Sequence, residues 1–97
     1  MIERIATVRN RDGIHCRPST VIVKSVIEYQ GSIRVFNNRG ESDLKSVLTL
    51  MALELLPGDT VTIQVSGPQE DERCAALVGL FETRFDFPAR RKAPAAL

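Results

Sequence analysis

The residues Gly13-Ile14-His15-Cys16-Arg17-Pro18-Ser19-Thr20 predict a point near the N-terminus where a loop turns into a helix. Gly13 permits a tight loop, and Pro18 fits the first turn of a helix, where a missing backbone N–H costs nothing. His15 is the only histidine among 97 residues, and Arg17 follows it closely. A helix N-terminus attracts anions through unpaired N–H groups and the helix dipole. A nucleophilic ring, a guanidinium group and a helix N-terminus together suit the transfer of a phosphoryl group.

The following residues predict an amphipathic helix over about Cys16–Tyr29. β-Branched residues are frequent here and favour a strand by propensity, but the spacing of the apolar residues is helical. Placed at about 100° per residue they form one arc, which consists of Ile22, Val23, Val26, Ile27 and Tyr29. Arg17 and Lys24 share a basic face, with Thr20 near it. Lys24 is equally readable as an ordinary solvated charge.

Four strands are predicted, separated by turns. The clearest is Val61–Val65, where apolar residues alternate with polar ones, and Ile2–Val8 is rich in β-branched residues. A hairpin is predicted from the short strand Ile33–Phe36, the turn Asn37–Gly40 and the weak strand Glu41–Leu44. The turn is favoured because its residues accept a positive φ.

A short second helix is predicted after Ser46, which can cap it. On a helical wheel its apolar residues point two ways, with Val47, Leu48, Met51 and Leu55 on one side and Leu50, Leu53 and Leu56 on the other. One short helix on a sheet buries only one stripe, so the surplus predicts a docking surface. A groove deep enough to bury all of these side chains is the alternative.

Gln69–Arg84 predicts a third helix that begins with acidic residues, which suit the helix dipole. Its apolar stripe consists of Cys74, Leu77, Val78, Leu80, Phe81 and Phe85. Pro88–Leu97 is rich in proline, alanine and basic residues, which indicates a disordered tail after a domain of residues 1–87. The order β-α-β-β-α-β-α predicts an α+β fold in which a four-stranded antiparallel sheet carries three helices on one face.

Composition narrows the classes of partner and cofactor. The formal net charge is +1 and the aromatic residues are four Phe and one Tyr, so we expect no nucleic-acid partner. No apolar run is long enough to cross a membrane and no signal-peptide pattern follows Met1, so we expect a cytoplasmic protein without membrane insertion. One histidine and the two distant cysteines, Cys16 and Cys74, make neither a disulfide framework nor a zinc site.

Two stretches of the chain resemble the HPr family, the histidine-containing phosphocarriers of the bacterial phosphoenolpyruvate-dependent sugar phosphotransferase system. The family's active-site motif resembles five residues of the first stretch, namely Gly13, Ile14, His15, Arg17 and Pro18. Lys45-Ser46-Val47-Leu48 is similar to the family's regulatory serine and docking helix. The resemblance runs from about Ile2 to about Phe85.

The resemblance implies an open-faced β-sandwich and a stoichiometric phosphoryl carrier rather than a true catalyst, with no metal and no cofactor. Enzyme I, charged by phosphoenolpyruvate, would phosphorylate His15 on Nδ1, and His15 would pass the group to an enzyme IIA domain. Arg17 would contact the phosphoryl group. Ser46 would be phosphorylated from ATP by the HPr kinase/phosphorylase, although taken alone Ser46 is more often only a helix cap.

We expect a monomer that meets its partners through one docking surface. The predicted docking residues are Cys16, Thr20, Lys24, Val47, Leu48 and Met51. Two positions depart from the family pattern. Cys16 replaces a small residue such as Ala, Ser or Thr, and Glu54 replaces a Gly that commonly ends the second helix, so that helix is expected to run on or to end differently. The tail after Phe85 is additional.

Three other functions remain open at this point. A regulator that signals chiefly through Ser46 would resemble the family's catabolite-repression paralogue, but that paralogue lacks the histidine that His15 supplies here. A carrier of the nitrogen-related phosphotransferase branch would also use His15. A binding module of similar topology would transfer nothing, and incubation with Enzyme I and labelled phosphoenolpyruvate separates it from a carrier.

Overall fold

A computed structural model describes residues 1–84, so Phe85 and the predicted tail, Pro88–Leu97, lie outside the described residues. Within residues 1–84 the elements follow the predicted order, as β1 (Ile2–Thr7), α1 (Cys16–Val26), β2 (Ser32–Asn37), β3 (Gly40–Ser42), α2 (Val47–Met51), β4 (Thr60–Ser66) and α3 (Glu70–Phe81). None of the helices in this part of the chain has the length and apolar character needed to cross a membrane.

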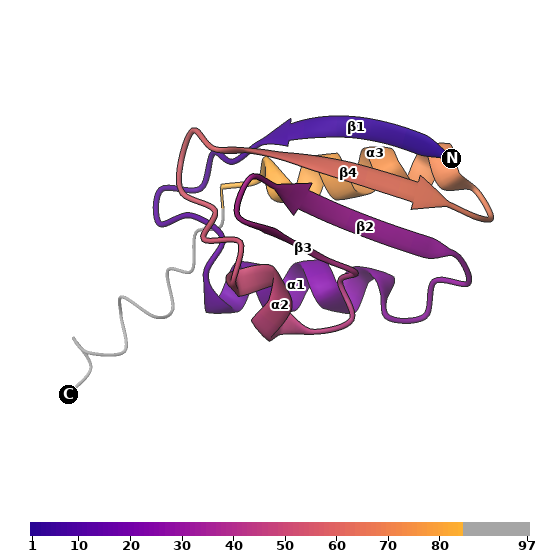
Figure 1. Cartoon of the computed structure of the whole chain (residues 1–97), viewed down its shortest axis with the longest axis horizontal. Coiled ribbons are helices and arrows are strands. Elements are labelled where there is room, and N and C mark those ends of the chain that lie inside the picture. The colour runs from indigo at the N-terminus through magenta and orange to yellow at the C-terminus, as the bar shows by residue number, and fades with distance from the viewer. Residues whose placement is uncertain (85–97) are drawn as a thin grey trace.

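The strands form one antiparallel sheet in the order β1-β4-β2-β3. The three helices lie on the same face of the sheet (Figure 1), and the other face is uncovered. This arrangement is the predicted α+β open-faced sandwich. Its consequence for function is that the N-termini of α1 and α2 both lie on the helical side of the molecule.

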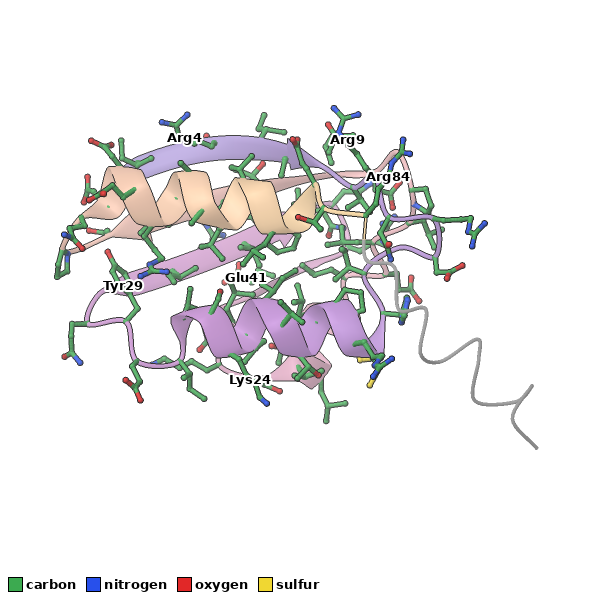
Figure 2. The ribbon with its side chains drawn as sticks, turned by 180° about the vertical axis from the view of Figure 1, so that it is seen from behind. Arg4, Arg9, Lys24, Tyr29, Glu41 and Arg84 are labelled. Atoms are coloured by element: carbon green, nitrogen blue, oxygen red, sulfur yellow. The ribbon has the colours of Figure 1, made fainter. Side chains whose placement is uncertain are left out.

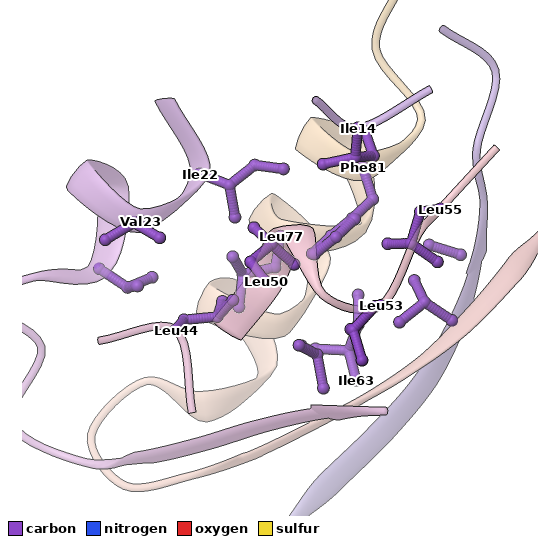
Figure 3. Close-up of a cluster of buried hydrophobic side chains, with 14 of the residues drawn as sticks. Ile14, Ile22, Val23, Leu44, Leu50, Leu53, Leu55, Ile63, Leu77 and Phe81 are labelled. Atoms are coloured by element: carbon purple, nitrogen blue, oxygen red, sulfur yellow. The ribbon is translucent and has the colours of Figure 1, made fainter. Parts of the chain in front are cut away.

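The core lies between the sheet and the helices. Alternation in β4 directs Val61, Ile63 and Val65 into it, while Thr60 and Ser66 at the strand ends are exposed. Figure 3 shows how the helices and the segment after α2 fill the space above Ile63, with Ile22 and Val23, Leu50, Leu53 and Leu55, and Leu77 and Phe81. Each of these large apolar side chains stabilises the fold by about 1.5–3 kcal/mol relative to exposure.

Helix α1 ends at Val26, three residues before the predicted end, and Ile27 is 69% exposed instead of lying in the apolar arc. The chain turns early because Tyr29 packs on the loops that follow. Its N–H donates to the Val26 carbonyl at 3.0 Å, and its hydroxyl donates to the Pro68 carbonyl at 2.8 Å. A side chain at Gly31 would lie 2.3 Å from the Ser66 carbonyl, so only glycine permits this close approach.

The hairpin turn between β2 and β3 is where it was predicted, but the reason given for it is wrong. Among the described residues, positive φ occurs at Gly13, Gly58 and Gly67 and at Leu44, Glu54 and Gln69, and thus at no residue of the turn. Instead the Asn37 side-chain oxygen accepts hydrogen bonds from the N–H groups of Arg39 (2.8 Å) and Gly40 (3.1 Å). The turn is therefore closed by a side chain that mimics a backbone acceptor.

A ladder of polar side chains crosses the uncovered face of the sheet from β1 to β3. Gln64 donates to Glu3 at 2.7 Å and accepts from Arg34 at 3.4 Å, and Arg34 pairs with Glu41 at 2.8 Å. The Arg34 guanidinium also lies 4.3 Å from the centre of the Phe36 ring. The ladder thus links two carboxylates and one guanidinium group across the strands through Gln64.

Candidate functional site

His15 is the N-cap residue of α1. Its backbone is extended (φ −101°, ψ −154°), its carbonyl accepts the first helical bond from the Ser19 N–H at 2.9 Å, and its imidazole makes no capping bond. The first turn of α1 contains no acidic residue. The half-buried His15 therefore lies at the positive end of the helix dipole, where a phosphoryl group would be stabilised.

The loop before His15 is held by buried hydrogen bonds. Asn10 is 4% exposed, and its side-chain N–H donates to the Gly13 carbonyl at 2.7 Å. The Ile14 N–H donates to the Leu55 carbonyl at 2.9 Å. Gly13 has a φ of 75°, and a Cβ there would lie 2.3 Å from the Leu55 carbonyl oxygen, so the position needs glycine twice over.

The structure brings together His15, Cys16 and Arg17 at the start of α1, with Cys16 and Arg17 exposed. Thr20 and Lys24 follow along the same helix. The Thr20 hydroxyl is tied back to the Cys16 carbonyl at 2.9 Å, and Lys24 projects away from the sheet (Figure 2). Five sequence-predicted site residues therefore lie on one helix.

Ser46 is the N-cap of α2, as predicted, and its hydroxyl accepts from the Leu48 N–H at 3.2 Å. Its carbonyl accepts from the hydroxyl of Thr49 at 3.0 Å. The hydroxyl of Ser46 is half-exposed and faces the start of a short helix, so it is both a structural cap and a chemically reachable group.

The apolar residues around α2 divide differently from the helical wheel. Leu55 is buried, not outward, and Leu56 is 60% exposed, not inward. The reason is that α2 ends at Met51 and Glu54 adopts a left-handed conformation (φ 52°), so the wheel does not apply beyond it. The helix thus does not run on past the position where the family commonly has Gly. Leu48 is 76% exposed, and Val47 and Met51 are half-buried beside it.

A shallow hollow of about 450 Å³ joins the two helices at the site. It is lined by Asp12, Ile14, His15, Arg39, Met51, Glu54, Leu55 and Leu56. His15 and Met51, which is one of the predicted docking residues, thus share one surface. Sequence reading missed Arg39 and Glu54 as parts of it, because only folding brings the β2–β3 turn and the loop after α2 to the histidine. The hairpin at Asn37–Gly40 could be predicted from the sequence, but its contact with the site could not.

The charged groups near this hollow are organised around Asp59. Its carboxylate accepts from the Leu56 N–H at 3.0 Å and pairs with Arg39 at 2.8 Å. The backbone bond from Leu56 first, and then Arg39, hold the pKa of this carboxyl below its ordinary value. Residues 1–84 contain no group of three or more His, Cys, Asp and Glu side chains placed to hold a metal ion.

Comparison with known proteins agrees with this geometry. A family model described as the PTS HPr component phosphorylation site matches residues 2–83. The phosphocarrier protein HPr of Cupriavidus necator is 32% identical over 85 residues, which are 88% of this chain and 96% of that protein. The phosphocarrier protein NPr of Escherichia coli is 28% identical over 86 residues, which are 88% of this chain and 96% of that protein.

A solved structure shares the fold as well. The crystal structure of HPr-C-His from Thermoanaerobacter tengcongensis matches with a TM-score of 0.76 at 28% identity, covering 84% of this chain and 91% of that one. The open-faced sandwich and these matches define a phosphocarrier protein of the phosphotransferase system. The chain belongs to the HPr family.

Proposed function

We propose that the protein relays a phosphoryl group from phosphorylated Enzyme I to enzyme IIA domains through a phosphohistidine at His15. The observation that carries this proposal is the position of His15, half-buried at the N-terminus of α1 with the exposed Arg17 in the same turn. A lone histidine in a core or on an open surface would have no group beside it that favours an anion. Here the helix end and a guanidinium group both do.

The chemistry consists of two displacements at phosphorus. A nitrogen of the neutral His15 ring, assigned as Nδ1 from the family resemblance, forms a bond to phosphorus while the bond from phosphorus to the donor breaks. In the second step the nucleophile of the acceptor takes the same group, and the ring is restored. Arg17 and the N–H groups at the start of α1 hold the phosphoryl oxygens by charge-assisted bonds, and little other help is needed. The protein supplies position and charge, and neither metal nor cofactor enters the scheme.

The partners meet this site over the surface between α1 and α2. We assign to it the exposed face of α1 and the outward side of α2, namely Cys16, Thr20, Lys24, Val47, Leu48 and Met51. Leu48, at 76% exposure, supplies the apolar centre and Lys24 a charge at the rim. We propose that the carrier works as a monomer in the cytoplasm.

Ser46 would connect this surface to regulation by the HPr kinase/phosphorylase. Its hydroxyl lies at the N-terminus of α2, directly before Val47 and Leu48. A phosphate there would be tolerated by the helix, because anions favour helix N-termini. The same charge would have to be partly desolvated whenever a partner covers Leu48.

The test is incubation of the full chain with Enzyme I and phosphoenolpyruvate labelled in its phosphoryl group. We expect an acid-labile label on the wild-type protein that transfers to an enzyme IIA domain, and no label on His15→Ala. Ser46→Ala is the matched control and should be labelled, because it leaves the ring in place. Acid-labile label on His15→Ala, or none on the wild type, would contradict the proposal.

A carrier in the nitrogen branch is the second candidate. The similarity to NPr, at 28% identity over 86 residues, comes close to the 32% over 85 residues for HPr. Both carriers would use His15, so the site alone does not separate them. Parallel labelling by sugar-branch Enzyme I and by its nitrogen-branch counterpart does, since the true donor should give the higher kcat/KM.

A further inference from the structure

Two side chains of the β2–β3 hairpin reach the segment that follows α2. Arg39 donates through Nε to the Leu53 carbonyl at 2.9 Å and through an Nη to the Glu54 carbonyl at 3.0 Å. Asn37 donates to the same Leu53 carbonyl at 3.1 Å. The Leu53 and Glu54 carbonyls lie beyond the end of α2, outside any helix or strand, so these bonds satisfy groups that would otherwise need water.

The same guanidinium group completes a second set of bonds on the other side of that segment. One of its Nη atoms donates to Asp59 at 2.8 Å, and the same Asp59 oxygen accepts from the Leu56 N–H at 3.0 Å. The Asp59 N–H in turn donates to the Leu56 carbonyl at 2.9 Å. Residues 53–56 are thus held by Arg39 directly at their start and through Asp59 at their end.

The held segment contacts the loop that carries His15. The Leu55 carbonyl, in the middle of the segment, accepts from the Ile14 N–H at 2.9 Å. The two backbone segments are in close contact here, because a Cβ on Gly13 would lie only 2.3 Å from the Leu55 oxygen. Ile14 is buried and is joined by one peptide bond to His15, so a displacement of Leu55 is passed to the imidazole.

Residues 53–56 require these hydrogen bonds, because the backbone of the segment is strained at Glu54. Glu54 has a φ of 52°, a conformation that residues with a Cβ avoid. Without the bonds from Arg39 and Asp59, the turn would relax toward ordinary φ values and Leu55 would move. Arg39 and Glu54 also line the hollow beside His15, so any such change occurs within the site.

We propose that Arg39 is a positioning residue for His15, acting through the carbonyls of Leu53 and Glu54, the carboxylate of Asp59 and the Leu55–Ile14 hydrogen bond. The expected effect of Arg39 on phosphoryl transfer rests on the proposed function of His15. The expected effect of Arg39 on the position of Ile14 does not. The planar fork of arginine is required, because one group serves three acceptors that lie in different directions. Arg39 does not touch the phosphoryl group in this scheme.

The test compares Arg39→Met with Arg34→Met. Arg34 is a matched control, because it too is an exposed arginine paired with a carboxylate at 2.8 Å, but it lies on the uncovered face of the sheet. The first measurement is amide hydrogen exchange of Ile14, with the buried Ile63 of β4 as the internal reference for global opening. We expect Arg39→Met to speed exchange at Ile14 by at least about tenfold while Ile63 changes little, and Arg34→Met to leave the ratio unchanged.

The second measurement is labelling by Enzyme I. Arg39→Met should lower the rate at saturating Enzyme I by at least about fivefold with KM little changed, since the docking surface remains and the ring is misplaced. Arg39→Lys should not restore the wild-type rate, and it replaces the methionine variant if that one does not fold. Parallel acceleration of Ile14 and Ile63, or equal losses in the Arg34 and Arg39 variants, would overturn the proposal.

The two arms separate this inference from the proposed function. If the wild-type chain accepts no label, the function of His15 fails, while the exchange ratio still decides whether Arg39 holds Ile14. If the wild type is labelled and Arg39→Met is labelled equally fast, the positioning role fails and the carrier function stands.

Discussion

Gly13 and Asn10 show how single residues place the imidazole without touching it. Asn10 is buried, yet its polar group is used, because it closes the loop by bonding the Gly13 carbonyl at 2.7 Å. Gly13 provides a positive φ and a surface without a side chain against Leu55. His15 is therefore positioned through the backbone of the preceding loop, which under the proposed function leaves its side chain to take the phosphoryl group.

Arg17→Ala should slow phosphoryl transfer by at least about tenfold, which corresponds to a loss of about 1.4 kcal/mol of transition-state stabilisation. The reason is the loss of the forked, charged donor beside the anion. The free energy of unfolding should change by less than about 0.5 kcal/mol, as at other exposed helix positions. Stopped-flow transfer and urea unfolding give the two numbers. A large loss of stability with transfer intact would contradict the assignment.

Cys16 should react with iodoacetamide at least about tenfold faster than Cys74 in the folded protein. Cys16 is exposed at the start of α1, whereas Cys74 is buried and its pKa is raised by burial. Mass spectrometry after timed alkylation reads both rates, and unfolded protein serves as the control in which they converge. Equal rates in the native state would show that the start of α1 is less open than described.

At the scale of elements, α2 is the shortest of the three helices in residues 1–84, and it forms the side of the site opposite α1. It spans only Val47–Met51, is capped by Ser46, and ends in a turn through Glu54 that returns Leu55 to the core. Isolated helices of this length are unstable, so its position depends on its cap and on packing. Both ends of α2 are therefore sensitive to substitution.

Glu54→Gly should raise the free energy of unfolding by about 1 kcal/mol, because glycine adopts a positive φ without the steric cost of a Cβ. The ion pair lost with it is long, 4.0 Å from Arg39, and exposed, so it offsets little. Ala52→Gly is the control. Its φ is −65°, so glycine there should destabilise the protein by about 0.5–1 kcal/mol. Thermal or urea unfolding of both variants measures the difference, and equal signs would contradict the account.

Ser46→Asp should slow the phosphorylation of His15 mainly through a higher KM for Enzyme I, with stability unchanged or slightly raised. Aspartate caps a helix as well as serine does, but it adds a charge that must be desolvated beneath a partner. Ser46→Ala, which removes the cap without adding charge, should instead cost about 1 kcal/mol of stability and leave KM near its original value. Wild-type kinetics in Ser46→Asp would mean that the residue is only a cap.

At the scale of the whole molecule, contacts distant in sequence close the sandwich at both ends. The N-terminal amino group pairs with Glu70 at 3.1 Å, and the Thr7 N–H donates to Glu82 at 2.8 Å, so β1 is tied to both ends of α3. At the site end, Asp59 and Arg39 bind the loop after α2 to the hairpin. Several of these links depend on ionised carboxylates.

Asp59→Asn tests the acid dependence of that end. The folded-state pKa of Asp59 is lowered, so its ionised form stabilises the fold above its ordinary pKa of about 3.9, and this contribution is lost as the pH falls through the lowered value. The wild type should therefore be more stable than Asp59→Asn at pH 7, with a gap that narrows only below about pH 4. Urea unfolding across this range measures the gap. If the difference in the free energy of unfolding stays constant to the lowest pH, the ionised form of Asp59 contributes nothing and only its hydrogen-bonding geometry matters.

Long periodic elements could be predicted from the sequence because their pattern records burial directly. The alternation of Val61, Ile63 and Val65 gave β4, and the apolar arc around Ile22 gave α1. The ends of helices could not, because Tyr29 and Glu54, which follow those ends, make hydrogen bonds to the distant residues Pro68 and Arg39. His15 could be proposed as a site residue from its neighbours in the sequence, whereas the contacts of Arg39 with the segment after α2 are evident only in the folded structure.

The uncovered face of the sheet is a suitable place to attach a label or a surface tether to this protein. His15 and Ser46 both lie at helix N-termini on the opposite side, and the ladder through Gln64 and Arg34 forms no part of the transfer surface. A fluorophore or surface tether attached through Thr62→Cys, in a chain in which Cys16 is replaced by Ser, would leave the helical side directed outward, because Thr62 is half-exposed on β4 between Ile5 and Phe36. Under the proposed function, the protein could then be immobilised in one orientation and charged repeatedly by Enzyme I, with partners arriving from solution.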